Sequence, residues 1–100
     1  MTTTTSIDQR PGATIDELRA ALETIDGGIV ELMARRYALT QRIGGTKRAA
    51  GLPVVDLAQE AAVIRRAAVL ARAAGLPAEP MRALFWHVVG LCRRGQLEES

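Results

Sequence analysis

Apolar residues in the first half of the chain recur at steps of three and four. The positions that follow this spacing are Leu18, Leu22, Ile25, Ile29, Leu32, Leu39 and Ile43. The spacing indicates one buried face of a helix that we expect to run from Ile15 to about Ala49. Thr14 and Glu17 have the spacing of a capping box, which marks the start of this helix. Two glycine pairs, Gly27–Gly28 and Gly44–Gly45, lie within this range. Each glycine lowers the stability of a helix by roughly 1 kcal/mol relative to alanine, so the pairs weaken the prediction that the helix is straight.

Two further helices are expected downstream. Asp56 is a good N-cap for a helix that runs to about Ala74, and Gly75 is a natural residue to end it. The residues expected on its inward face are Leu57, Ala61, Ile64, Ala68 and Ala71. Pro80 suits the first position of a third helix, which we expect to fray around Gly95. The apolar residues of that helix are Leu84, Phe85, Val88, Val89 and Cys92. The predicted fold class is therefore all-α, with a long, a medium and a short helix.

The length of the first helix bears on the state of assembly. Residues 1–13 are polar and rich in threonine, so we expect a flexible N-terminal arm before a helical domain over residues 14–100. A helix over residues 15–49 is roughly 50 Å long, whereas a compact domain of this size has a radius of gyration of only about 13 Å. Its apolar stripe needs a second chain to cover it. The sequence therefore predicts an intertwined homodimer.

Composition narrows the classes of function. Hydrophobic residues make up 48% of the chain, which is ample for a core, and a net charge of +2 does not require a polyanionic partner. Cys92 is the only cysteine and His87 the only histidine, so a disulfide within the chain and a Cys/His zinc site are excluded. The sequence has neither an apolar stretch of about 18 residues nor a secretory signal. We expect a cytoplasmic protein with no metal, cofactor, membrane or nucleic-acid partner.

Two cations interrupt the apolar stripe of the first helix. Continuing the three-four spacing beyond Leu32 leads to Arg36, and continuing it beyond Ile43 leads to Lys47. A buried cation requires a counter-anion or water, so these residues are candidates for binding an anionic ligand. The alternative is that both extend to the surface or pair with acids of another helix.

Other polar residues share faces at helical spacing. Asp56 and Glu60 are four residues apart, as are Cys92 and Gln96. Taken alone, they are explained as a helix cap, an exposed acid in the first turn, a core thiol and a solvated amide. Arg19 lies next to the apolar stripe and alone is explained as a surface arginine.

Five short elements nevertheless occur in a specific order. They are LR-x6-D (Leu18, Arg19, Asp26), ARR (34–36), IG-x2-K (Ile43, Gly44, Lys47), PV-x-D-x3-E (Pro53, Val54, Asp56, Glu60) and LF-x10-Q (Leu84, Phe85, Gln96). In this order and spacing they resemble the all-helical chorismate mutase family over residues 14–96. The resemblance implies a dimer formed through the first helix. It also implies conversion of chorismate to prephenate, an intramolecular rearrangement that needs no metal, cofactor or covalent intermediate.

The resemblance also implies roles for individual residues. Arg36 binds a substrate carboxylate within its own protomer, and Arg19 reaches a carboxylate in the partner's site. Lys47 and Gln96 donate hydrogen bonds to the ether oxygen, on which negative charge grows as its bond breaks.

Asp56 and Glu60 are expected, by the same resemblance, to hold the ring hydroxyl of the substrate. Cys92 stands where family members often have a serine that helps to bind a carboxylate, and a thiol is a poorer donor. Gln59 and Val55 replace arginines found in some relatives, which removes positive charge near the site.

Alternative functions remain open at this point. An isochorismate-pyruvate lyase or a 4-amino-4-deoxychorismate mutase would use the same cations for a closely related dianion. A non-catalytic helical dimer that binds nucleic acid or a partner protein is an alternative of another class. The arginine pairs that suggest it are 35–36, 65–66 and 93–94, which fall on different faces. A larger shikimate-pathway enzyme is a further possible partner.

Overall fold

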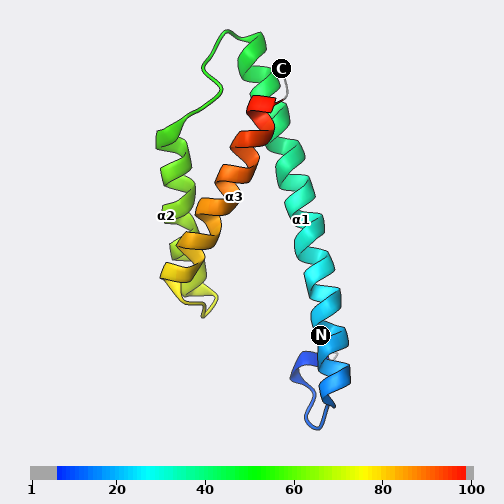
Figure 1. The fold of residues 1–100 in the computed structure, drawn as a ribbon. Coiled ribbons are helices and arrows are strands. Elements are labelled where there is room, and N and C mark those ends of the chain that lie inside the picture. Colours follow the sequence, from blue (N-terminus) through cyan, green and yellow to red (C-terminus); the bar gives the residue numbers. More distant parts are fainter. Residues whose placement is uncertain (1–6, 99–100) are drawn as a thin grey trace, which may run out of the picture. The chain divides into compact units, whose positions relative to one another are not determined.

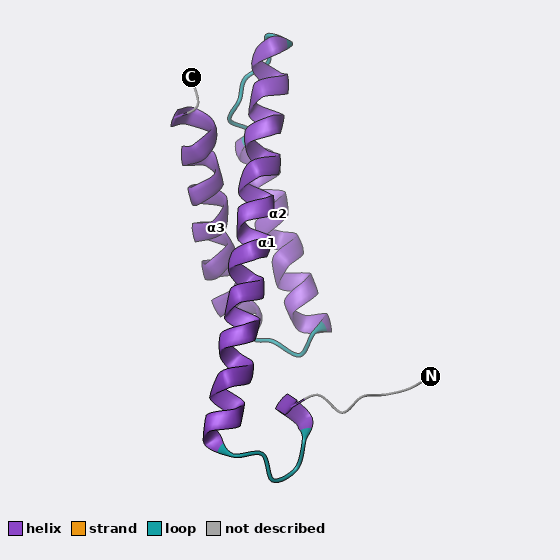
Figure 2. Cartoon of the chain, turned by 90° about the vertical axis from the view of Figure 1, so that its right-hand side faces the viewer, coloured by secondary structure: helices purple, strands orange, loops and turns teal. Residues whose placement is uncertain are grey.

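A computed structural model describes residues 7–98 of the chain. It contains a 3-10 helix η1 (Ile7–Gln9) and three α-helices, α1 (Ile15–Ala49), α2 (Leu57–Ala73) and α3 (Ala78–Glu98). Over the described residues the chain consists of helices and loops alone (Figure 2). This confirms the predicted all-α class. No helix in this part of the chain combines the length and apolar character needed to cross a membrane.

The start of α1 is fixed by the predicted capping box. The backbone N–H of Thr14 donates to Glu17 Oε1 at 3.0 Å, and the backbone N–H of Glu17 donates to Thr14 Oγ1 at 3.1 Å. Arg10 forms an ion pair with the same carboxylate. These contacts hold the pKa of Glu17 below its ordinary value, chiefly through the backbone hydrogen bond from Thr14. Residues 1–6 of the predicted arm lie outside the described residues, so the flexibility of the arm stays a prediction.

The chain divides within α1 into two compact units, one ending at Arg35 and the other beginning at Arg36. In the first unit α1 runs through Gly27 and Gly28 without a break. Its apolar side chains Leu22, Ile25, Ile29 and Leu32 are 49–62% exposed in the single chain. The face that the sequence predicts to be buried is therefore open to solvent in an isolated protomer.

The second unit contains the end of α1 together with α2 and α3 (Figure 1). Its buried hydrophobic residues are Ala67, Ala68, Ala71, Val88, Val89 and Cys92. Because the buried residues that α2 provides are all alanines, α2 and α3 pack closely against each other. Leu57 and Ala61, predicted to face inward, are exposed instead, since burial on α2 is confined to its second half.

The sequence predicts both ends of α2 correctly, but neither end of α3. Asp56 caps α2 as expected, with Oδ1 accepting the backbone N–H of Gln59 at 3.0 Å, and Gly75 follows its end with φ of 78°. The expectation of fraying at Gly95 is wrong, because α3 continues to Glu98. With 21 residues, α3 is longer than α2, which has 17. Pro80 lies in the first turn of α3 rather than at its first position, because the helix begins at Ala78.

Candidate active site

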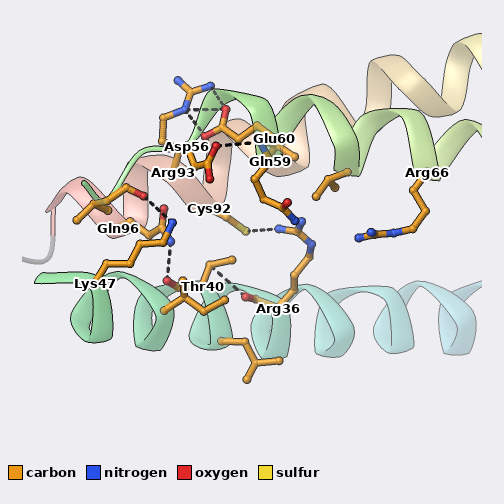
Figure 3. Close-up of a pocket in the computed structure, with 15 residues that line it drawn as sticks. Arg36, Thr40, Lys47, Asp56, Gln59, Glu60, Arg66, Cys92, Arg93 and Gln96 are labelled. Carbon is orange, nitrogen blue, oxygen red and sulfur yellow. Dashed lines mark hydrogen bonds and ion pairs between the residues drawn. The ribbon is translucent and has the colours of Figure 1, made fainter. Parts of the chain in front are cut away.

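A cavity of about 300 Å³ lies within the second unit, between the end of α1, the loop before α2, and the helices α2 and α3. Its polar lining residues are Arg36, Thr40, Lys47, Asp56, Gln59, Glu60, Arg66, Cys92, Arg93 and Gln96 (Figure 3). This lining includes every candidate site residue that the sequence places on these segments, namely Arg36, Lys47, Asp56, Glu60, Cys92 and Gln96. Four of the lining side chains are cationic and two are acidic, so the cavity suits an anionic ligand of small size.

Arg36 and Cys92 connect α1 to α3. Arg36 Nη1 donates to Cys92 Sγ at 3.0 Å, and Cys92 is only 3% exposed. A guanidinium carries five N–H donors, so this contact orients the group and leaves donors for a ligand carboxylate. The contact of Cys92 in this structure is thus with Arg36, and its expected contact with a substrate stays a prediction.

Gln96, a residue of α3, is held against α1. Its side chain is 9% exposed, and Nε2 donates to the backbone oxygen of Thr40 at 2.7 Å. Arg48, which also belongs to α1, donates to the backbone oxygen of Gln96. The interpretation of Gln96 as a solvated amide is therefore wrong, because tertiary contacts order the last turns of α3. Since the amide carries two N–H donors, one remains for a ligand.

Two glycines leave room for side chains at the contact between α1 and α3. A Cβ atom on Gly95 would lie 2.5 Å from Cζ and Oη of Tyr37, so the ring would have to shift to admit any larger residue. A Cβ on Gly44 would lie 3.3 Å from Cγ of Gln96. Glycine at these two points leaves space for the Tyr37 ring and for the Gln96 side chain, which lines the cavity.

Lys47 is positioned by the way in which α1 ends. Gly51 has φ of 72°, and the N–H of Leu52 donates to the backbone oxygen of Lys47 at 2.8 Å, as in a Schellman motif. The chain then turns back over the helix end. Lys47 Nζ donates to the backbone oxygen of Val54 at 3.3 Å, so the loop holds the ammonium group at the cavity.

Glu60 forms an ion pair that the sequence did not reveal. Arg93 Nε lies 3.2 Å from Oε1 and 3.0 Å from Oε2, and Arg93 Nη2 lies 3.0 Å from Oε1. The Glu60 side chain is 19% exposed, so its interpretation as an ordinary exposed acid is wrong. Hydrogen bonding and charge from Glu60 raise the pKa of Arg93, which keeps the guanidinium charged.

Sequence reasoning thus missed Arg93 as a lining residue and treated it as part of a solvated arginine pair. The spacing that singled out Arg36 could have found it, because Val89, Arg93 and Gln96 are also separated by four and three. Arg19 belongs to the first unit, where its side chain is exposed on α1. Its predicted role involves a second protomer and stays a prediction.

Comparisons with known proteins identify a family for the chain, and a relative carries the name of a different enzyme. A protein named 3-dehydroquinate dehydratase, from Pyrobaculum aerophilum, is 34% identical over 86 residues. The matched region covers 86% of this chain but only 25% of that protein, so the chain spans about a quarter of its length. No solved structure matches the chain at a significant level. The family of chorismate mutase type II matches residues 18–97, and the chain therefore belongs to this family.

Proposed function

We propose that the chain catalyses the rearrangement of chorismate to prephenate. The observation that carries this proposal is the convergence of Arg36, Lys47 and Gln96 on one cavity within a chain of this family. A dicarboxylate requires paired cations, and donors fixed at the ether oxygen stabilise the charge that develops there. Holding the flexible substrate in its compact shape lowers the entropic part of the barrier.

In this proposal Arg36 binds one carboxylate, while Lys47 and Gln96 donate to the ether oxygen. The free donors of Arg36, the second N–H of the Gln96 amide and the Nζ group of Lys47 support these roles. Asp56 and Glu60, at the other side of the cavity, hold the ring hydroxyl.

The proposed active form is a homodimer in which Arg19 binds the second carboxylate in the partner's site. Support comes from the exposed apolar stripe of α1, where Leu22, Ile25 and Ile29 require a cover in water. A second copy of the same chain supplies an identical stripe, as symmetric dimers do.

The proposed function is tested by incubating the purified chain with chorismate and following prephenate formation. Parallel incubations contain isochorismate and 4-amino-4-deoxychorismate. Salicylate and pyruvate from isochorismate, without prephenate from chorismate, would instead identify a lyase. Loss of the Arg36 side chain in Arg36→Ala is expected to lower kcat/KM by about 100-fold or more, as removal of a fixed donor does elsewhere. The exposed neighbour provides the matched control, Arg35→Ala, which is expected to keep activity.

A further inference from the structure

The ion pair between Glu60 and Arg93 bears on which substrate the cavity accepts. It is a forked contact in which both carboxylate oxygens accept N–H groups at 3.0–3.2 Å. The side chains are 19% and 35% exposed, so the pair is partly shielded from solvent. Figure 3 shows the guanidinium on the far side of the Glu60 carboxylate from Arg36. The charge of Glu60 is therefore compensated before any ligand enters.

A carboxylate in this state still accepts a hydrogen bond. The single N–H of Arg93 Nε is shared between Oε1 and Oε2, and Nη2 donates to Oε1, so Oε2, which has two acceptor positions, keeps one of them open. A neutral hydroxyl can donate to the remaining position at no electrostatic cost. An ammonium group would instead bring a second cation toward a carboxylate that Arg93 already neutralises.

The other charges around the cavity reinforce this difference. Arg36, Lys47 and Arg66 are cations that line the same space. Asp56 is the second acid, and its Oδ1 is engaged by the backbone N–H of Gln59 at 3.0 Å. Because these cations surround the cavity and Arg93 neutralises Glu60, the lining has little net negative charge that would attract a cationic group.

We propose that Arg93 is a specificity-determining residue, which through its ion pair with Glu60 makes the cavity select a ring hydroxyl over a ring ammonium. The inference rests on the proposed function and names the substrate class within it. Chorismate carries the hydroxyl, and 4-amino-4-deoxychorismate carries an amine that is protonated near neutral pH. Arg93 acts through Glu60 and takes no part in bond breaking.

The test compares kcat/KM for these two substrates in the full chain and in three variants. Arg93→Met removes the charge but keeps much of the apolar stem, and Arg93→Lys keeps the charge. Arg94→Met is the matched control, because Arg94 is exposed and lies outside the cavity lining. We expect the preference for chorismate to fall by about tenfold or more in Arg93→Met, since like charges brought together at a binding site are strongly unfavourable. Arg93→Lys and Arg94→Met are expected to keep most of the preference.

A binding measurement separates this inference from the proposed function. Calorimetric titration with prephenate and with 4-amino-4-deoxyprephenate compares the same hydroxyl and amine without requiring turnover. If no substrate reacts, the proposed function fails, while a shift in the binding ratio in Arg93→Met still supports the role of Arg93. Equal losses for both compounds in Arg93→Met, with no change in their ratio, would show a structural role only and overturn the inference. A preference of the unaltered chain for the amines would overturn it as well.

Discussion

Substitution of Gly95 by alanine tests how tightly α3 packs against the Tyr37 ring. The added Cβ would lie 2.5 Å from Cζ and Oη of Tyr37, whereas carbon atoms in contact prefer a separation of about 3.5 Å or more. The outer edge of the ring must therefore retreat by about 1 Å. Such overpacking costs about 1–3 kcal/mol, while replacing glycine by alanine inside a helix stabilises it by about 1 kcal/mol. We expect Gly95→Ala to lower the free energy of unfolding by up to about 2 kcal/mol.

Removal of the ring reverses the sign of the effect. In a Tyr37→Ala background the added methyl group meets no ring, so Gly95→Ala is expected to stabilise the chain by up to about 1 kcal/mol. Gly45→Ala is the matched control, because Gly45 lies inside α1 with no heavy atom near the added Cβ, and it is expected to be stabilising in both backgrounds. Urea unfolding followed by circular dichroism, at one fixed chain concentration, measures all of these differences. Equal stabilisation by Gly95→Ala in both backgrounds would refute the reasoning.

Three further predictions concern the amide, the helix start and the exposed stripe. Gln96→Glu is expected to confine activity to acidic pH, because only a protonated carboxyl donates to the ether oxygen, and a flat pH profile would contradict this role. The carboxylate of Glu17 has a pKa below its ordinary value of 4.5, so its stabilisation of α1 is present above that pH and is lost as the pH falls through the lowered pKa. An NMR titration is expected to show the pKa of Glu17 rising toward 4.5 in Arg10→Met, and an unchanged value would rule out the contribution of the ion pair. Ile29→Glu places a charge on the exposed stripe and is expected to abolish dimers in sedimentation, which an unchanged mass would contradict.

The sequence predicted those features that depend on local chemistry. The capping box at Thr14, the N-cap at Asp56 and the stop at Gly75 each satisfy backbone groups within a few residues, so their meaning can be derived without tertiary structure. The cations Arg36 and Lys47 were likewise identified because they interrupt a regular helical stripe.

Features that depend on contacts between distant segments were missed. Glycine has a low helix propensity, and Gly95 was therefore interpreted as a point of fraying, although its contact with Tyr37 orders the helix beyond it. The ion pair of Glu60 and Arg93 joins residues 33 positions apart, a separation on which neither propensity nor periodicity depends. Exposure of Leu57 has a similar origin, because the packing partner of each turn cannot be derived from the pattern of one helix.

The position of Gln96 in the last turns of α3 has a consequence for how activity responds to local opening. Terminal turns of helices open far more often than the interior of a domain, at a free-energy cost well below that of global unfolding. Opening of residues near Glu98 would break the contact of Gln96 with Thr40 while α2 and the rest of α3 stay folded. With Gln96 in its proposed role, we expect activity to follow the amide-exchange protection of this single helical turn. Additions to the carboxyl end that loosen the turn are then expected to abolish activity without unfolding the protein.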